Sequence, residues 1–208
     1  MIDIDSLITR FDKGLRTLFA PAQSVRPLPG GDAVEPELDQ SQRERVGALM
    51  RVNHTGEICA QALYQGQSLT ARDSDARRAL EQAAQEETEH LAWTAHRMDE
   101  LGSRRSLLNP LWYAGSFAIG AAAGLLGDRW SLGFLAETER QVVRHLEGHL
   151  RELPPEDQKS RAILEQMRND EERHATGALK YGAAELPPPA RLAMRLCSMA
   201  MTKTAFWI

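Results

Sequence analysis

Two copies of one short motif constrain the fold of this chain more than any other feature. In each copy a histidine follows a glutamate three residues later, as His90 follows Glu87 and His174 follows Glu171. Residues three apart on an α-helix project from the same face, so each pair offers one carboxylate and one imidazole to a single point. One such pair would be unremarkable in a chain rich in glutamate. Two pairs in matching surroundings indicate a shared site.

A further glutamate precedes each motif by nearly the same interval. Glu57 precedes Glu87, and Glu139 precedes Glu171, by about 30 residues, the length of a long helix and a short turn. Each of these glutamates therefore falls at the height of the following motif on a neighbouring helix. The pattern predicts an all-α fold made of two helical hairpins. Ferritin-like four-helix bundles that bind two iron or two manganese ions arrange their ligands in this way.

Length, charge and cysteine content narrow the class of protein. The 208 residues suffice for one domain with a buried helical core. A net charge of -4 argues against a nucleic-acid partner. The two cysteines, Cys59 and Cys197, lack the paired spacing of a disulfide framework, a zinc site or an iron–sulfur site. No basic stretch opens the N-terminus, so we expect no secretory signal.

The chain divides into an N-terminal part, residues 1–40, and a bundle, residues 41–208. In the first part, apolar residues recur at helical spacing from Leu7 to Phe19, which predicts an amphipathic helix. This helix either docks on the bundle or lies on a membrane surface. Several prolines and the pair Gly30-Gly31 then predict a linker or mobile loop.

Apolar periodicity and start signals predict the four bundle helices. We expect them at residues 41–70, 75–101, 129–152 and 155–182. Ser41 begins a capping box for the first, Asp128 caps the third, and Pro155 suits the first turn of the fourth. On the second helix, Glu81 and Glu86 are expected on a solvated face.

Two apolar segments lie outside the bundle helices. Residues 107–127 carry no charge and are long enough to cross a bilayer. A crossing would separate the two hairpins, so we expect a crossover segment that lies on the bundle or dips into one leaflet. Gly120 and Gly124 permit close helix approach there. Residues 192–208 predict an apolar C-terminal helix that docks on the bundle, on another subunit or at a membrane interface.

The set of ligand types limits the chemistry. Four glutamates balance the charge of two divalent ions, as a buried site requires. Carboxylates and imidazoles without a thiolate suit iron or manganese. Such a site supports iron oxidation and storage, peroxide breakdown, or O2 activation for attack on an organic substrate, and the ligands alone do not choose among these.

The chain resembles the demethoxyubiquinone hydroxylases of ubiquinone biosynthesis from about residue 41 to residue 182. The resemblance rests on His54-Thr55-Gly56-Glu57, Glu86-Glu87-Thr88-Glu89-His90-Leu91, Glu137-Thr138-Glu139 with His145, and Asp170-Glu171-Glu172-Arg173-His174. It implies a bacterial member with a ferritin-like bundle, a crossover segment and extra amphipathic helices at both ends. By position it implies these ligands of two iron ions: Glu57, Glu87, His90, Glu139, Glu171 and His174. In that assignment Glu87 and Glu171 bridge the ions, and His145 lies behind the ligands.

The third bundle helix holds one departure from some relatives and one choice between glutamates. Those relatives have a tyrosine after His145, whereas this chain has Leu146. The resemblance therefore carries over no tyrosine-relayed electron transfer at that position. Glu139 is preferred to Glu137 as the ligand because its register matches the family and it shares a helix face with Val142 and Leu146.

The resemblance implies hydroxylation of a demethoxyubiquinol ring, with O2 as co-substrate and NADH as external reductant. No Gly-x-Gly-x-x-Gly fingerprint is present, so we expect no stable NADH site. Expected partners are a polyprenylated quinol, the membrane surface and other proteins of ubiquinone biosynthesis, with a homo-oligomer left open. We expect a peripheral protein at the cytoplasmic face of the bacterial inner membrane. The alternatives are a ferritin-like ferroxidase or peroxidase, and a non-enzymatic quinone-binding scaffold.

Overall fold

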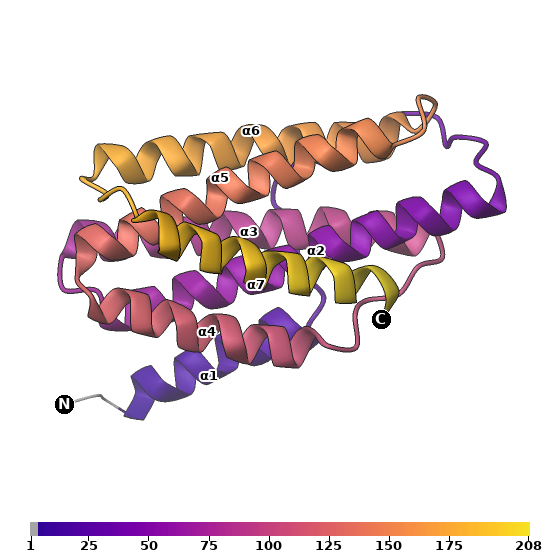
Figure 1. Cartoon of the computed structure of the whole chain (residues 1–208). Coiled ribbons are helices and arrows are strands. Elements are labelled where there is room, and N and C mark those ends of the chain that lie inside the picture. The colour runs from indigo at the N-terminus through magenta and orange to yellow at the C-terminus, as the bar shows by residue number, and fades with distance from the viewer. Residues whose placement is uncertain (1–3) are drawn as a thin grey trace.

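Helices make up the regular structure of the described residues (Figure 1). The computed structural model describes residues 4–208, and the side chains of Ser6, Leu7 and Arg10 lie outside that description, with the part of the expected amphipathic pattern that they carry. The helices are α1 (Ile4–Phe19), α2 (Gln40–Thr70), α3 (Ser74–Glu100), α4 (Asn109–Leu125), α5 (Asp128–Glu152), α6 (Gln158–Lys180) and α7 (Pro188–Trp207). The predicted all-α fold is confirmed.

Two helical hairpins, α2 with α3 and α5 with α6, form the bundle (Figure 1). Helix α4 runs back along the bundle from the end of α3 to the start of α5, so α3 and α5 run in the same direction. A bundle with one long crossover connection is the ferritin-like arrangement. The predicted hairpins and crossover are confirmed, with α1 and α7 as additional helices.

Helix α2 begins before the residue that was predicted to cap it. Asp39, not Ser41, is the cap: its carboxylate accepts the backbone N–H of Gln42 at 2.8 Å. The Gln42 side chain in turn accepts the backbone N–H of Asp39 at 2.9 Å. A capping box is therefore present, but it starts earlier because Asp39 offers a strong acceptor at the right spacing.

The start of α5 also differs from the prediction. Gly127 precedes the helix with a φ of 101°, a conformation that favours glycine. The Asp128 carboxylate does not cap α5. It accepts the backbone N–H groups of Arg72 and Asp73 at 3.1 and 2.8 Å, and so ties the turn between α2 and α3 to the start of α5.

Helix α6 begins at Gln158, later than predicted. The Asp157 carboxylate accepts the backbone N–H of Ser160 at 3.0 Å and caps the helix. Pro155, expected in the first turn, lies instead in the turn before the cap.

Two apolar clusters fill the bundle at different heights. The first consists of Val46, Leu49, Met50, Trp93, Met98, Leu101, Leu146, Leu153, Ile163, Leu164 and Met167. The second consists of Ala60, Leu63, Tyr64, Ala71, Leu80, Ala83, Leu135, Ala136 and Ala178. On α3, Glu87 and His90 lie between Ala83 of the second cluster and Trp93 of the first. The same order holds on the other bundle helices, so the predicted ligands form a polar layer between two apolar ones.

Three outer helices pack on the bundle. Helix α4 lies so close to α2 that a Cβ at Gly66 or Gly120 would collide with backbone atoms of the facing helix. Helix α7 packs on α2 and α5, and Arg51 donates to the carbonyl oxygen of Ala205 at 2.7 Å. Helix α1 packs on α2 and α4. No helix within residues 4–208 has both the length and the apolar character needed to cross a bilayer.

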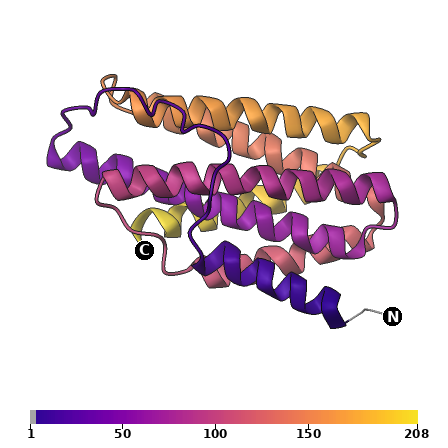
Figure 2. The same ribbon diagram turned by 180° about the vertical axis from the view of Figure 1, so that it is seen from behind.

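Residues 20–39, which we call the strap, connect α1 to α2. The strap crosses α3 and then follows α6, as seen from behind in Figure 2. The hydroxyl of Ser24 and the backbone N–H of Arg26 both donate to the Glu89 carboxylate on α3. Farther along, Glu35 accepts from the buried Arg97 guanidinium at 3.0 Å. The predicted linker is therefore held against the bundle by specific contacts.

Candidate metal centre

The structure brings all six predicted ligands together in the polar layer. Their donor atoms form two groups, and within each group the atoms lie within 4.8 Å of one another. The first group is Glu57, Glu87, His90 and Glu171, and the second is Glu87, Glu139, Glu171 and His174. Because Glu87 and Glu171 belong to both groups, two adjacent ions would share these two carboxylates.

Burial and unpaired oxygens show that the cluster fits two divalent cations. Glu87 and Glu139 are fully buried, yet Glu87 Oε1 and Glu139 Oε2 have no hydrogen-bond partner. A buried carboxylate oxygen without a partner is costly, and a bound cation removes that cost. The donor set of carboxylates and imidazoles suits iron or manganese.

The carboxyl groups of the cluster perturb one another. Burial, followed by the nearby Glu171 and Glu57, raises the pKa of Glu87 well above its usual range. Burial and Glu171 raise the pKa of Glu139 to about 8. Burial acts on Glu171 too, but hydrogen bonds from the two histidines outweigh it and lower the pKa to about 2. Ionisation of all four carboxyl groups is therefore unfavourable unless positive partners are present.

Both histidines turn the same ring nitrogen toward the carboxylates. His90 Nδ1 lies 3.1 Å from Glu87 Oε2 and 3.1 Å from Glu171 Oε1. His174 Nδ1 lies 3.0 Å from Glu171 Oε2 and 3.5 Å from Glu139 Oε1. Nδ1 is therefore the nitrogen that each imidazole presents to an ion.

The opposite nitrogen of each histidine meets a carboxylate outside the cluster. His90 Nε2 lies 3.0 Å from Asp170 Oδ2, and His174 Nε2 lies 2.8 Å from Glu86 Oε2. An ionised carboxylate only accepts hydrogen bonds, so each Nε2 carries a proton. In the metal-free cluster each Nδ1 also donates to Glu171, and a bound metal ion would take the place of that Nδ1 proton. Burial would raise the pKa of Asp170, but hydrogen bonds from His90 and Arg26 hold it well below its usual range. The hydrogen bond from His174 lowers the pKa of Glu86 to about 2.

Sequence reasoning missed these two outer carboxylates. The placement of Glu86 on a solvated face was wrong, because its side chain is only 24% exposed and binds His174, whereas Glu81 is exposed as predicted. One signal was available. An acidic residue directly precedes each motif: Glu86 precedes Glu87, and Asp170 precedes Glu171. In the structure each of these residues pairs with the histidine of the other motif, Glu86 with His174 and Asp170 with His90. The two motifs are thus linked reciprocally.

A buried tyrosine adds a hydrogen bond to the cluster. The hydroxyl of Tyr64, on α2, donates to Glu139 Oε1. Burial and the neighbouring Glu139 carboxylate raise the pKa of Tyr64 well above its usual range, so the hydroxyl keeps its proton and remains a donor. Sequence reasoning assigned Tyr64 no role.

The structure places the two competing glutamates of α5 differently. Glu139 is fully buried and lies in the second group of donor atoms. The Glu137 carboxylate accepts from Gln141 Nε2 at 2.8 Å and from Arg144 Nη2 at 3.3 Å. Glu137 is therefore occupied by partners on its own helix.

His145 contacts another histidine. Its ring centroid lies 3.9 Å from that of His149, and burial lowers the pKa of His145 to about 4, so the ring is neutral. The expected position of His145 behind the ligands stays a prediction. Leu146, next in the chain, is fully buried in the first apolar cluster.

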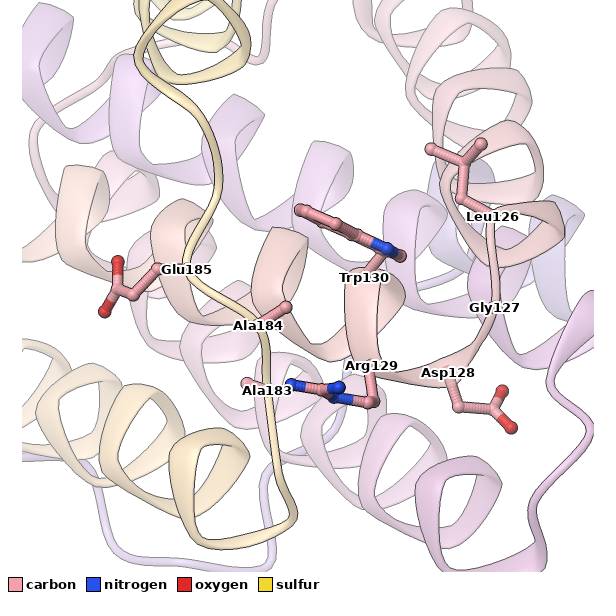
Figure 3. A pocket seen from close by; sticks show the side chains of 8 residues that line it. All are labelled: Leu126, Gly127, Asp128, Arg129, Trp130, Ala183, Ala184 and Glu185. Carbon is pink, nitrogen blue, oxygen red and sulfur yellow. The ribbon is translucent and has the colours of Figure 1, made fainter.

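Two surface pockets lie near the bundle. One, of about 560 Å³, is lined by the turn between α4 and α5 and by residues 183–185 after α6 (Figure 3). None of its lining residues belongs to the Glu/His cluster. The other, of about 720 Å³, lies among α1, α2 and α3, and its lining includes Tyr64, Gln61 and Thr88. Through Tyr64 this second pocket borders a residue that contacts the cluster.

Comparisons with known proteins agree with this geometry. The sequence pattern of the family described as ubiquinone biosynthesis protein COQ7 matches residues 44–205. The chain is 62% identical to a 3-demethoxyubiquinol 3-hydroxylase from Nitrosospira multiformis over 100% of both chains. It is 65% identical to a protein of the same name from Aromatoleum aromaticum over 99% of this chain and 100% of the relative. A relative of that name from Nitrosomonas europaea is 59% identical over 100% of both chains. With its ferritin-like bundle and paired Glu-x-x-His motifs, the chain belongs to the COQ7 family of ubiquinone biosynthesis proteins.

Proposed function

We propose that the chain is a 3-demethoxyubiquinol 3-hydroxylase whose six clustered side chains bind two iron ions. Glu57 and His90 would hold one ion, Glu139 and His174 would hold the other, and Glu87 and Glu171 would be shared between them. The observation that carries this proposal is the pair of overlapping donor groups that share two buried glutamates. Relatives about 60% identical over the full length carry the name of that activity.

The reaction replaces a ring hydrogen of the quinol by a hydroxyl group. One oxygen atom of O2 enters the ring, and the other leaves as water after taking up two electrons and two protons. Held by the clustered residues, two ferrous ions would supply the electrons that O2 needs, and NADH would serve as the external reductant.

The chain's own residues hold and shield this site. Asp170 and Glu86 fix the ring orientation and the protonated nitrogen of His90 and His174. Tyr64 donates to Glu139 and so limits how that carboxylate turns. The apolar clusters above and below the polar layer exclude water, which strengthens the electrostatic interactions inside.

The polyprenyl tail of the substrate requires an apolar surface. Exposed apolar side chains occur on all three outer helices: Ile4, Ile8, Phe11 and Phe19 on α1, Leu111, Ile119 and Leu125 on α4, and Leu192, Leu196, Met199 and Trp207 on α7. Such surfaces suit binding within the lipid headgroup region. We place the chain at the cytoplasmic face of the bacterial inner membrane, and its two unpaired cysteines fit a reducing compartment.

Vesicle sedimentation tests the membrane assignment. The double substitution Phe11→Ser with Phe19→Ser should release the protein from phosphatidylglycerol-containing vesicles. Val34→Ser is the matched control, because Val34 is an apolar side chain of the strap that is 88% exposed but lies outside the three helices. Equal binding of the two variants would contradict a role for α1.

Product analysis tests the activity itself. Metal-free protein is reconstituted anaerobically with ferrous iron, then given NADH, 18O2 and a short-chain demethoxyubiquinol. The hydroxylase forms a quinol that carries one 18O atom. Binding of two irons without oxygenated quinol would favour a ferroxidase or peroxidase. Failure to bind iron would favour a non-enzymatic scaffold.

A further inference from the structure

Arg26 of the strap donates to both oxygens of Asp170, whereas α6 donates to only one of them. The carboxylate is fully buried. Oδ1 accepts from Gln166 Nε2 at 2.8 Å and from Arg173, both on α6. Oδ2, which faces His90 at 3.0 Å, accepts from Arg26 Nη1 at 2.7 Å. Arg26 Nη2 also donates to Oδ1, at 3.4 Å. The oxygen that faces the histidine is thus anchored by the strap and not by α6, while the strap and α6 both anchor the other oxygen.

We infer that Arg26 is a positioning residue of the metal centre, which fixes the Asp170 oxygen that orients His90. The inference rests on the proposed function only in requiring that the six clustered residues bind metal. Through Arg26, the N-terminal strap becomes part of the support of one imidazole ligand. Partners behind a metal ligand commonly change metal affinity by about 10–100-fold when they are removed.

The guanidinium group is fixed on a second side by an aromatic ring. Arg26 lies 4.7 Å above the ring of Trp93, within the range of a cation–π interaction. The same tryptophan donates from Nε1 to Ser24 Oγ of the strap at 3.1 Å, and its ring centroid lies 5.4 Å from that of His90. Trp93 therefore contacts both Arg26 and His90, and Asp170 Oδ2 joins the same two side chains. A lysine would keep the charge but lose the planar group that meets both partners.

The other half of the centre lacks this support within the described residues. Glu86 Oε2 accepts from His174, and Glu86 Oε1 accepts from Gln82 Nε2 at 3.0 Å, a neighbour on the same helix. Among the described residues, no hydrogen bond or ion pair joins the strap to Glu86 or to His174. Removal of Arg26 should therefore affect His90 and leave His174 unchanged.

Cobalt(II) titration of the metal-free full-length protein tests the inference. Co2+ is a paramagnetic probe, and each ligating histidine gives its own shifted, exchangeable imidazole N–H signal in the proton NMR spectrum. Glu86→Gln assigns the His174 signal. Arg26→Ala should move the His90 signal, speed its exchange with solvent and weaken one of the two Co2+ affinities about ten-fold. Arg26→Lys should restore these properties only in part.

Ser24→Ala is the matched control for the strap. It removes the contacts of the Ser24 hydroxyl with Glu89, Trp93 and the Arg26 carbonyl oxygen, but leaves the side-chain pair of Arg26 and Asp170 in place. If Ser24→Ala moves the His90 signal as much as Arg26→Ala, the strap acts only as general support and the inference fails. It also fails if Arg26→Ala changes both signals equally or neither. Absence of Co2+ binding by the unaltered protein would overturn the proposed metal centre, and this inference with it.

Discussion

The two halves of the proposed metal centre contain the same types of side chain but have different surroundings. On the His90 side, the outer carboxylate Asp170 is fully buried and is held by donors from the strap and from α6. On the His174 side, the outer carboxylate Glu86 is 24% exposed and has one further donor, from its own helix. His90 itself is fully buried, whereas the His174 side chain is 9% exposed.

This difference teaches that a duplicated motif does not produce equivalent sites. Each Glu-x-x-His pair fixes which atoms meet, but segments elsewhere in the chain decide how firmly they are held. A buried, fully paired carboxylate orients its histidine more rigidly than one that water can reach. We therefore expect the ion on the His90 side to bind more tightly, and the ion on the His174 side to exchange more readily.

Removal of a clustered carboxylate should have the largest effect on iron binding. The number of ions lost should distinguish residues shared by both halves from residues that belong to one half. Glu171→Ala removes a carboxylate common to both groups and should abolish binding of both ions and all hydroxylation. Glu139→Ala should leave one ion, on the His90 side, with no activity. The iron content of each variant after anaerobic reconstitution measures how many ions it binds. Loss of both ions from Glu139→Ala would break the division into halves.

The choice of ligand on α5 gives the next test. Glu139→Ala should abolish hydroxylation, whereas Glu137→Ala should leave most of it, because the Glu137 carboxylate is paired with Gln141 and Arg144 on its own helix. Turnover of a short-chain substrate is the measurement. The reverse result would assign Glu137 to the ion on the His174 side.

The outer carboxylates should have intermediate and unequal effects. Asp170→Asn and Glu86→Gln each replace a charged acceptor by an amide of similar size. Each should weaken one ion by about 10–100-fold, with the larger loss for Asp170→Asn because its site is closed to water. Competition with a coloured iron chelator measures both affinities. Equal losses would show that the strap adds nothing to the His90 side.

The tyrosine on the His174 side should have the smallest effect. Tyr64→Phe leaves a buried oxygen of Glu139 without its donor and should lower the unfolding free energy of the metal-free protein by about 1–3 kcal/mol. Tyr113→Phe is the matched control, since its hydroxyl donates to the partly buried Gln65. Urea denaturation measures the unfolding free energy of both variants. A smaller loss for Tyr64→Phe than for the control would show that Glu139 does not depend on this hydroxyl.

The six clustered residues could be predicted because their placement follows helix periodicity, with the resemblance needed to prefer Glu139 to Glu137. Residues three apart share a face, and hairpins of similar length bring Glu57 to Glu87 and Glu139 to Glu171. A small error in a helix boundary does not disturb this pattern. The shift of the cap from Ser41 to Asp39, for example, leaves the register of Glu57 unchanged.

The outer contacts could not be predicted from periodicity. Whether Asp170 reaches His90 depends on how α3 and α6 are rotated about their axes, and sequence spacing does not specify that rotation. The strap has no periodic pattern, and its prolines and glycines indicate only the absence of helix. Its attachment through Ser24 and Arg26 follows from tertiary contacts with residues far along the chain.

The contact between Arg26 and Asp170 joins residues 144 positions apart. Closing so long a loop is entropically unfavourable, so pairs close in sequence form first and this one forms late. During synthesis the strap emerges early, yet the partner of the Arg26 guanidinium is missing until α6 has folded against α3. The orientation of His90 therefore depends on completion of the whole bundle. A chain that stalls before its second hairpin assembles lacks this support, which links metal loading to the end of folding.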